Sequence, residues 1–462
     1  MSRRYNLLRI PWIRSLLYHR AFQFGLSLFA LAGFWLAVLA GLLGTPVGNR
    51  NFSIVLVWIA WWGALMLVSV PIFGRGWCSI CPIPLPGEWL QRGALLAPQG
   101  EATVRRTSGL GVEKRWPKIL RNAWLQNGMF VLVALFSMPI LTQPRLTAMA
   151  LLALLGLALT ISLIFERRAF CRYLCPLGGF IGLYAQLAPL EVRVRDATIC
   201  AKHQEKTCYW GNNKGYGCPW QVFPPGLIKN TSCGFCMECL RACPYENIAL
   251  NLRPFGADLT VWRGRRLDEA YKALILLGSV LFYVALFLGP WGGLKWAAYE
   301  VGRTPWLVYV TAFLLVTLVI IPGWFGLSVW LGKRWSKGSE TMRTLFIRQA
   351  YALLPLGLAS WVAFSLSLVS ANLSYVVATL SDPMGWGWNL FGTAGIRWTP
   401  WMVNILPFLQ LGVLIGGLAW SGWTSRRIAA EQRFEPQVTQ QSLPVVSFCF
   451  AITLILMRLL IA

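Results

Sequence analysis

Nine apolar stretches of 16 to 26 residues limit what this chain can fold into more than any other feature of its sequence. They run over residues 21–43, 52–73, 123–141, 146–165, 273–288, 306–331, 350–369, 401–420 and 445–461. A helix needs about 20 residues to cross the hydrocarbon core of a bilayer. Charged residues make up only 13% of the chain, about half their share in a soluble domain. The sequence therefore predicts an all-α integral membrane protein with about nine transmembrane helices.

Lysine and arginine are distributed unevenly between the segments that join these stretches. Segments 1–22, 74–122, 166–272, 332–348 and 421–444 hold 36 of the 42, and cytoplasmic segments carry such an excess. We therefore expect the cell inner (cytoplasmic) membrane, with the amino terminus inside and the carboxyl terminus outside. The net charge of +25 follows from this topology, so the expected partners are membrane lipid and an acidic cytoplasmic electron carrier, and not nucleic acid.

Four cysteines near the middle of the chain follow the spacing C-x2-C-x2-C-x3-C-P: Cys233, Cys236, Cys239 and Cys243. This is the spacing of the bacterial ferredoxin loop that binds [4Fe-4S] clusters. Structural zinc sites also use C-x2-C pairs, but they have no use for four closely spaced cysteines that end in Cys-Pro. The run therefore predicts an iron–sulfur cluster.

A second Cys-Pro pair, Cys218-Pro219, lies upstream and follows Cys200 and Cys208. In two-cluster ferredoxins the fourth cysteine of each run ligates the other cluster. The crossed assignment gives cluster 1 the ligands Cys233, Cys236, Cys239 and Cys218. It gives cluster 2 the ligands Cys200, His203, Cys208 and Cys243. The sequence thus predicts two [4Fe-4S] clusters in a ferredoxin-like module.

His203 stands where a fourth thiolate of cluster 2 is expected. An imidazole replaces thiolates in Rieske centres, where it raises the reduction potential. The alternative is a [3Fe-4S] cluster, with His203 facing solvent. Both interpretations fit the sequence.

The amino-terminal apolar stretches form an internal repeat of two hairpins. Each hairpin ends in a Cys-Pro motif, Cys78-Ser79-Ile80-Cys81-Pro82 in the first and Cys171-Arg172-Tyr173-Leu174-Cys175-Pro176 in the second. Because both hairpins insert in the same sense, we expect a parallel repeat that brings these four cysteines together just inside the bilayer, close to the ferredoxin-like module. They are interpreted as a third metal or redox site or a redox-active dithiol, and alternatively as buried packing residues.

These motifs divide the chain into three segments. Residues 1–165 form the amino-terminal membrane hairpin repeat with the first Cys-Pro motif. Residues 166–272 form a cytoplasmic insert with the second Cys-Pro motif and the two-cluster module. Residues 273–462 form a carboxyl-terminal membrane region of five helices.

Two Cys-Pro motifs after membrane hairpins, followed by a two-cluster ferredoxin loop, resemble the membrane polyferredoxin family of NapH/NosR-type 4Fe-4S membrane proteins. The stretches 215–220, 243–248 and 251–256 are similar to the FesM-like branch, which keeps several membrane helices after the loop. The resemblance implies a membrane-bound iron–sulfur protein that passes electrons between a cytoplasmic donor or partner oxidoreductase and the quinone pool. The chain departs from the family pattern at His203 and in the shorter spacing of Cys78 and Cys81.

Two other functions fit the same motifs. One is an accessory or maturation factor that reduces metal or thiols for another enzyme, and the other is an anchoring subunit of a larger redox complex. No residue is assigned a catalytic role, and haem is not expected because the chain has only two histidines. Gln410, Ser365 and Ser367 are polar positions within apolar stretches that would suit a quinone pocket, although hydrogen bonds between helices are the more common use.

Overall fold

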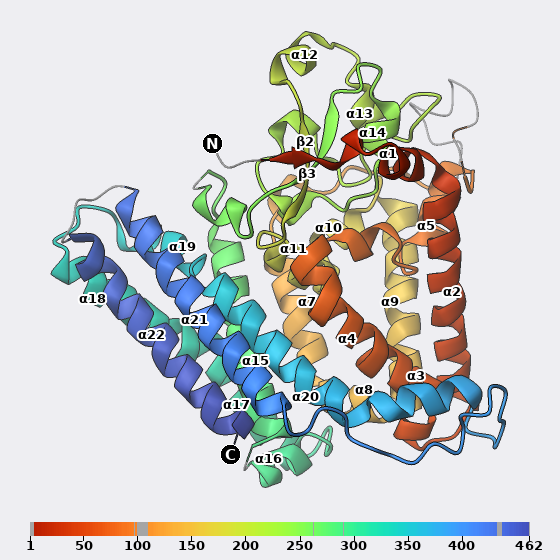
Figure 1. Ribbon diagram of the computed structural model, residues 1–462, viewed down its shortest axis with the longest axis vertical. Helices are drawn as coiled ribbons and strands as arrows, with labels where there is room; N and C mark the ends of the chain where they lie inside the picture. The colour runs from red at the N-terminus through yellow and green to blue at the C-terminus, as the bar shows by residue number, and fades with distance from the viewer. Residues whose placement is uncertain are drawn as a thin grey trace. The chain divides into compact units, whose positions relative to one another are not determined.

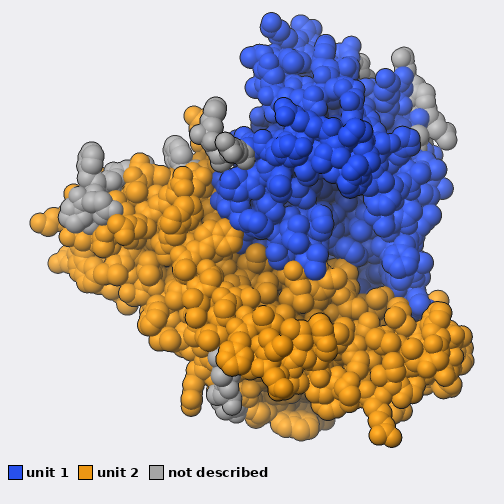
Figure 2. Space-filling view, viewed as in Figure 1, with its two compact units in different colours: residues 1–38, 68–126, 149–258 blue, residues 39–67, 127–148, 259–462 orange. Residues whose placement is uncertain are grey.

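The computed structural model describes residues 4–96, 98, 110–261, 263–289, 291–431 and 437–461. The chain forms two compact units, each built from three separate stretches (Figure 2). Unit 1 comprises residues 1–38, 68–126 and 149–258, and unit 2 comprises residues 39–67, 127–148 and 259–462. The division into segments 1–165, 166–272 and 273–462 concerns membrane topology and stays a prediction.

Within the described ranges, eight helices are long and apolar enough to cross a membrane (Figure 1). They run over Arg20–Leu43, Phe52–Phe73, Pro144–Ile164, Leu267–Phe287, Thr304–Trp335, Met342–Ser381, Leu406–Ala430 and Gln437–Leu460. Each contains all or most of one apolar stretch of the sequence. The chain is therefore an α-helical integral membrane protein, as predicted.

The predicted span over residues 123–141 is not one continuous helix. It forms α7 (Trp124–Leu135) and α8 (Ser137–Thr142), separated at Phe136, which leaves helical geometry. Pro139 explains the break, because it has no N–H to donate to the carbonyl of Leu135 and its ring clashes with that carbonyl. The prediction of nine full-length membrane helices is therefore not confirmed.

Unit 2 is a bundle organised around α15 (Leu267–Phe287). After Lys272 this helix is almost entirely apolar, and most of its residues are buried, as expected for a helix at the centre of a bundle. It packs against α18 (Ile321–Trp335), α19 (Met342–Ala350) and α20 (Leu353–Ser381). Helix α20 packs in turn on α21 (Leu406–Ala430), and α21 packs on α22 (Gln437–Ile461). The other described helices of the unit are α3 (Phe52–Ile54), α4 (Trp62–Ala64), most of α7, α8, α16 (Gly292–Ala297) and α17 (Thr304–Leu314).

Three segments of the membrane helices are π-helical: Val55–Trp61, Leu65–Phe73 and Leu315–Ile320. The second contains Pro71, which cannot donate a backbone hydrogen bond. It ends directly before the first Cys-Pro motif, and wide helical turns of this kind are frequent near functional sites.

Unit 1 combines parts of membrane helices with a small sheet. Its helices are α1 (Pro11–Tyr18), most of α2 (Arg20–Leu43), α5 (Leu85–Arg92), most of α9 (Pro144–Ile164), α10 (Ala169–Tyr173), α11 (Pro176–Tyr184), α12 (Ala197–Lys202), α13 (Thr207–Trp210) and α14 (Glu238–Ala242). Short 3-10 turns include η5 (Gly76–Ser79) and η8 (Asn230–Ser232). Both turns lie in or beside the cysteine motifs.

The sheet has three antiparallel strands in the order β1 (Tyr5–Asn6), β3 (Ile248–Leu252) and β2 (Leu190–Val194). Leu252 is paired with both Tyr5 and Leu190. The apolar core beside the sheet is formed by Leu8, Val192, Phe235, Met237, Leu240, Ile248 and Leu250. The partly buried cysteines Cys233, Cys239 and Cys243 pack against this core. The amino terminus thus belongs to the same structure as the ferredoxin-like motif.

Candidate iron–sulfur sites

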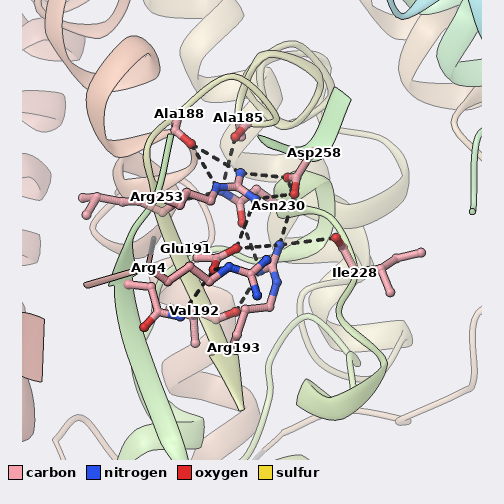
Figure 3. A network of polar contacts seen from close by, with 12 residues as sticks. Arg4, Ala185, Ala188, Glu191, Val192, Arg193, Ile228, Asn230, Arg253 and Asp258 are labelled. Atoms are coloured by element: carbon pink, nitrogen blue, oxygen red, sulfur yellow. Dashed lines mark hydrogen bonds and ion pairs between the residues drawn. The ribbon is translucent and has the colours of Figure 1, made fainter. Parts of the chain in front are cut away.

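A buried network of charges holds the start of the ferredoxin-like loop on the sheet (Figure 3). Arg253 donates to Asp258 through both terminal nitrogens and to Glu191 at 3.1 Å. Asp258 accepts the backbone N–H of Asn230 at 2.7 Å, and Asn230 donates through its amide to the carbonyl of Leu190 at 2.6 Å. Because Asn230 opens the turn η8 that leads into Cys233, the network fixes where the loop begins.

The loop itself is coiled by residues in the left-handed region. Phe235 lies between Cys233 and Cys236 with φ of 53°, and Met237 follows with φ of 58°. Such angles are unfavourable for residues other than glycine, and they persist at functional sites that the surrounding structure over-determines. The backbone N–H groups of Phe235 and Glu238 donate to the sulfurs of Cys233 and Cys236. The backbone is therefore shaped around the sulfur atoms.

The four predicted ligands of cluster 1 lie close together. Burial raises the pKa of Cys239 well above its usual value, and the thiols of Cys236, Cys233 and Cys218 lie near enough to raise it further. Burial also raises the pKa of the Cys233 thiol to about 11, with Cys218 again contributing. Backbone N–H groups of Trp220 and Val222 donate to the sulfur of Cys218. This set of soft sulfur donors fits an iron–sulfur cluster, since bound iron stabilises the thiolate form that burial disfavours.

Glu238 ties the same loop to the amino-terminal helices. Its carboxylate accepts hydrogen bonds from Arg20 at 2.7 Å, from Arg241 at 2.8 Å and from the backbone N–H of Tyr216 at 2.8 Å. Arg241 donates further to the carbonyl of Tyr18. Residues far apart in sequence therefore fix the helix that carries Cys239.

The four predicted ligands of cluster 2 line a single small pocket. Its walls are formed by Ile199, Cys200, His203, Thr207, Cys208, Phe223, Cys243, Tyr245, Asn247 and Ile248. Asn247 donates to two of the sulfurs, through its side chain to Cys200 at 3.2 Å and through its backbone to Cys243 at 3.3 Å. Burial, followed by the nearby thiols of Cys243 and Cys200, raises the pKa of Cys208 to about 12.

His203 is at the end of α12 and is partly buried. Its ring makes an edge contact with Tyr245, with ring centroids 5.1 Å apart. The imidazole therefore belongs to the pocket wall together with the three cysteines, which is the position that a fourth ligand requires. Ligation by His203 stays a prediction.

The four cysteines of the two Cys-Pro motifs also converge. Burial raises the pKa of the Cys81 thiol, and the thiols of Cys171 and Cys78 raise it further. Burial likewise raises the pKa of Cys175 to about 12, with Cys81 and Cys78 contributing. The geometry fits the predicted convergence, and the donor set of four thiols fits a soft metal or an iron–sulfur cluster.

The local sequence positions these cysteines at the starts and ends of helices. The Cys175 sulfur caps α11 by accepting the backbone N–H of Gly178 at 3.2 Å. Pro176 occupies the first turn of that helix, where a missing N–H costs nothing. Cys78 lies in the turn η5, and the backbone N–H of Ile83 donates to Cys81.

No group of three His, Cys, Asp or Glu side chains within the described ranges is tight enough for a single metal ion. A zinc ion binds its ligands at about 2.0–2.3 Å, so its four donors must nearly touch one another. A cubane offers four separate irons to its thiolates, and its ligands stand farther apart. Cysteines too far apart to share one metal ion can therefore still serve as ligands of a cluster.

The polar positions suggested for a quinone pocket are used within unit 2. Gln410 donates to the carbonyl of Ala363 at 2.8 Å and to the hydroxyl of Ser367 at 2.5 Å. Ser365 accepts the indole N–H of Trp62 at 3.1 Å. These polar groups therefore form hydrogen bonds between helices, the more common use of such residues.

Comparison with known proteins bears on the cysteine motifs directly. A family model described as a 4Fe-4S binding domain matches residues 54–98 and 147–194, the two segments that contain the Cys-Pro motifs. The chain is also 29% identical over 143 residues to the putative electron transport protein YccM of Escherichia coli strain K12. In these segments the chain is therefore similar to iron–sulfur proteins of the membrane polyferredoxin type.

These matches support the resemblance to membrane polyferredoxins, whereas the FesM-like branch stays a prediction. The YccM match covers 29% of this chain and 35% of that protein, so the chain spans about a third of the length of its curated relative. No solved structure matches. The family match covers Cys78, Cys81, Cys171 and Cys175 and ends before the insert that carries the ligands of clusters 1 and 2.

Proposed function

We propose that this chain is a membrane-bound iron–sulfur protein that transfers single electrons between a cytoplasmic partner and the lipid phase. The proposal is carried by one observation: eleven of the twelve cysteines, together with His203, fall into three groups of four within unit 1. Clusters bound by these groups would supply the redox chemistry. The chain supplies ligands, burial and orientation. The name of YccM, a putative electron transport protein, supports this assignment.

The exposed border of the cluster 2 pocket supports a place for this group on the solvent side of the electron path. The cluster 2 pocket is bordered by exposed Tyr245 and Ile199, with exposed Lys202 and Lys206 nearby in the sequence. This apolar and basic rim suits the docking of an acidic electron carrier. We therefore propose electron entry from a cytoplasmic donor or partner redox subunit at cluster 2.

Links between the groups support onward transfer. The thiol of Cys208 lies near enough to Cys239 to raise its pKa, which connects the cluster 2 group with the cluster 1 group. Arg168 is near both Cys236 of cluster 1 and Cys171 of the Cys-Pro motifs. The groups thus neighbour one another in the order cluster 2, cluster 1 and the four-cysteine site, by which we mean Cys78, Cys81, Cys171 and Cys175.

We propose that the four-cysteine site holds a third [4Fe-4S] cluster and passes electrons to a quinone. The 4Fe-4S domain match on its two segments supports the cluster, and their position directly after membrane helices supports an acceptor in the lipid phase. A redox-active dithiol is less well supported. Reactive cysteines have lowered pKa values, whereas burial raises the pKa of Cys81, Cys171 and Cys175.

The test combines metal analysis with electron acceptance. The purified chain should contain about 12 iron and about 12 acid-labile sulfide atoms, as expected of three cubanes. Cys171→Ser should lower both to about eight, and Cys449→Ser, at the one cysteine outside the groups, should leave them unchanged. Dithionite-reduced protein should be reoxidised by a soluble quinone analogue. Zinc in place of iron would refute the proposal, and reoxidation that Cys171→Ser does not slow would remove the quinone step.

A further inference from the structure

Arg75 is a buried arginine with an incomplete set of partners. It precedes the first Cys-Pro motif and is 4% exposed. One terminal nitrogen, Nη1, donates to the carbonyl of Thr231, and the guanidinium lies 4.1 Å from the centre of the Trp220 ring. Nε and Nη2 have no hydrogen-bond partner among the described residues. A buried charged group with unbonded donors is costly, so an acceptor is expected beside it.

Two glycines of α11 leave space for this guanidinium. A Cβ atom at Gly182 would lie 2.9 Å from Nη1, and one at Gly178 would lie 3.3 Å from Nη2. Gly178 and Gly182 are four residues apart and therefore share one face of the helix. The same Cβ at Gly178 would lie 3.3 Å from the Cβ of Cys175. The side chain of Arg75 is thus accommodated directly beside a cysteine of the four-cysteine site.

Cysteines of two ligand groups lie beside Arg75. Gly178 brings its Nη2 next to Cys175 of the four-cysteine site. The bond of Arg75 to Thr231 holds it two residues before Cys233. The two N–H groups without partners are therefore in a region that two groups of thiolates share.

Trp220 adds a further unpartnered donor at this place. Its ring is buried, and its indole N–H has no hydrogen-bond partner in the described part of the chain. A Cβ atom at Gly234 would lie 2.0 Å from this nitrogen, so the indole N–H lies against the backbone between Cys233 and Phe235. Several donors without protein acceptors next to thiolate ligands indicate an anionic group that accepts from them.

We propose that Arg75 is the shared counter-ion of cluster 1 and the four-cysteine site, donating Nε–H and Nη2–H to the sulfur atoms bound there. This inference rests on the proposed function. A positive charge stabilises the electron that reduction adds, and hydrogen bonds to cluster sulfurs tune the potential. Arg75 therefore raises the reduction potential of both centres and is a positioning and tuning residue.

The test is a redox titration of the purified full-length chain followed by electron paramagnetic resonance. Arg75→Gln should shift the midpoint potentials of cluster 1 and of the four-cysteine centre to more negative values and leave cluster 2 unchanged. Arg75→Lys, which keeps the charge, should leave both midpoint potentials close to the wild-type values. The control is Arg303→Gln, because Arg303 belongs to unit 2 and is 75% exposed in its pair with Glu300; it should change none of the three potentials.

The outcomes separate this inference from the function on which it rests. A wild-type chain without iron–sulfur centres refutes the proposed function. A wild-type chain with its centres, together with Arg75→Gln at unchanged potentials or with an equal shift at cluster 2, refutes the role of Arg75 alone. If the Arg75→Gln protein assembles no centres, the Arg75→Lys protein distinguishes the two roles. If Arg75→Lys assembles its centres at near wild-type potentials, Arg75 acts as the counter-ion. If Arg75→Lys also fails to assemble them, Arg75 is a structural residue.

Discussion

Arg168 and Glu88 form a buried ion pair that joins the two halves of the cysteine repeat. Nε and Nη2 of Arg168 donate to the two carboxylate oxygens of Glu88 at 2.6 Å and 2.7 Å, and Nη1 donates to the carbonyl of Cys78 at 2.5 Å. The side chains are 4% and 5% exposed. Arg168 precedes the second Cys-Pro motif and Glu88 follows the first. The pair therefore holds the four-cysteine site together from both sides.

Breaking this pair should destabilise the protein strongly. Removing one partner of a buried ion pair leaves an uncompensated charge and costs about 3–5 kcal/mol. We expect Arg168→Leu to lower the free energy of unfolding by that amount in a chemical denaturation assay in detergent. The control is Arg303→Leu, because Arg303 is 75% exposed in its pair with Glu300 and exposed pairs contribute little. Equal effects of the two variants would contradict the structural role of Arg168.

The same pair should make stability depend on pH. Burial alone would raise the pKa of the Glu88 carboxyl, but Arg168 and then Arg92 hold it below its usual range. Since the folded pKa is lower than the unfolded value of about 4.3, Glu88 stabilises the fold fully above that value. This contribution is lost as the pH falls through the folded pKa.

The measurement is the unfolding temperature as a function of pH. We expect it to fall more steeply below about pH 4 in the wild type than in Glu88→Gln, which has no carboxyl to titrate. Parallel curves for the two proteins would show that Glu88 is not linked to folding in this range.

Hydropathy and cysteine spacing account for most of the fold and of the candidate ligands. Eight of the nine apolar stretches form long helices, because length and apolar character decide insertion. The stretch 123–141 differs because hydropathy does not register that Pro139 interrupts backbone hydrogen bonding. The three groups of candidate ligands could be proposed from the sequence because spacing within a loop and the Cys-Pro pairs are local signals.

Partners that are distant in the chain were not predictable in this way. Arg75 and Arg168 counted only as positive charges at the inner face, because their contacts lie 156 residues away at Thr231 and 80 residues away at Glu88. The strand β1 has two residues and no alternating pattern, so nothing local indicated that it pairs with β3. The basic residues directly before each Cys-Pro motif were the one available signal for the arginines.

His203 should control the potential of cluster 2. If the imidazole ligates iron, His203→Cys replaces a neutral ligand by a thiolate and should lower the midpoint potential of cluster 2 alone. The control is His19→Cys, because His19 is the other histidine and is exposed, with its ring bonded to the carbonyl of Ser15. An unchanged midpoint and an unchanged resonance signal in His203→Cys would assign His203 to the pocket wall only and favour the three-iron alternative.

Gly234 should be essential for cluster 1 because its missing side chain makes room for Trp220. A Cβ atom there would lie 2.0 Å from the indole nitrogen and 2.3 Å from the adjacent ring carbon, distances that require the loop or the buried indole to move. Such overpacking typically costs about 1–3 kcal/mol, and here the displaced backbone also carries Cys233 and Cys236. We expect Gly234→Ala to lose the iron and the resonance signal of cluster 1 while it keeps those of cluster 2.

The control is Gly226→Ala, because no atom lies within 4 Å of a Cβ built there and its φ is not positive. A Gly234→Ala protein with full iron content and an unchanged cluster 1 signal would mean that the ligand loop does not depend on its packing against Trp220.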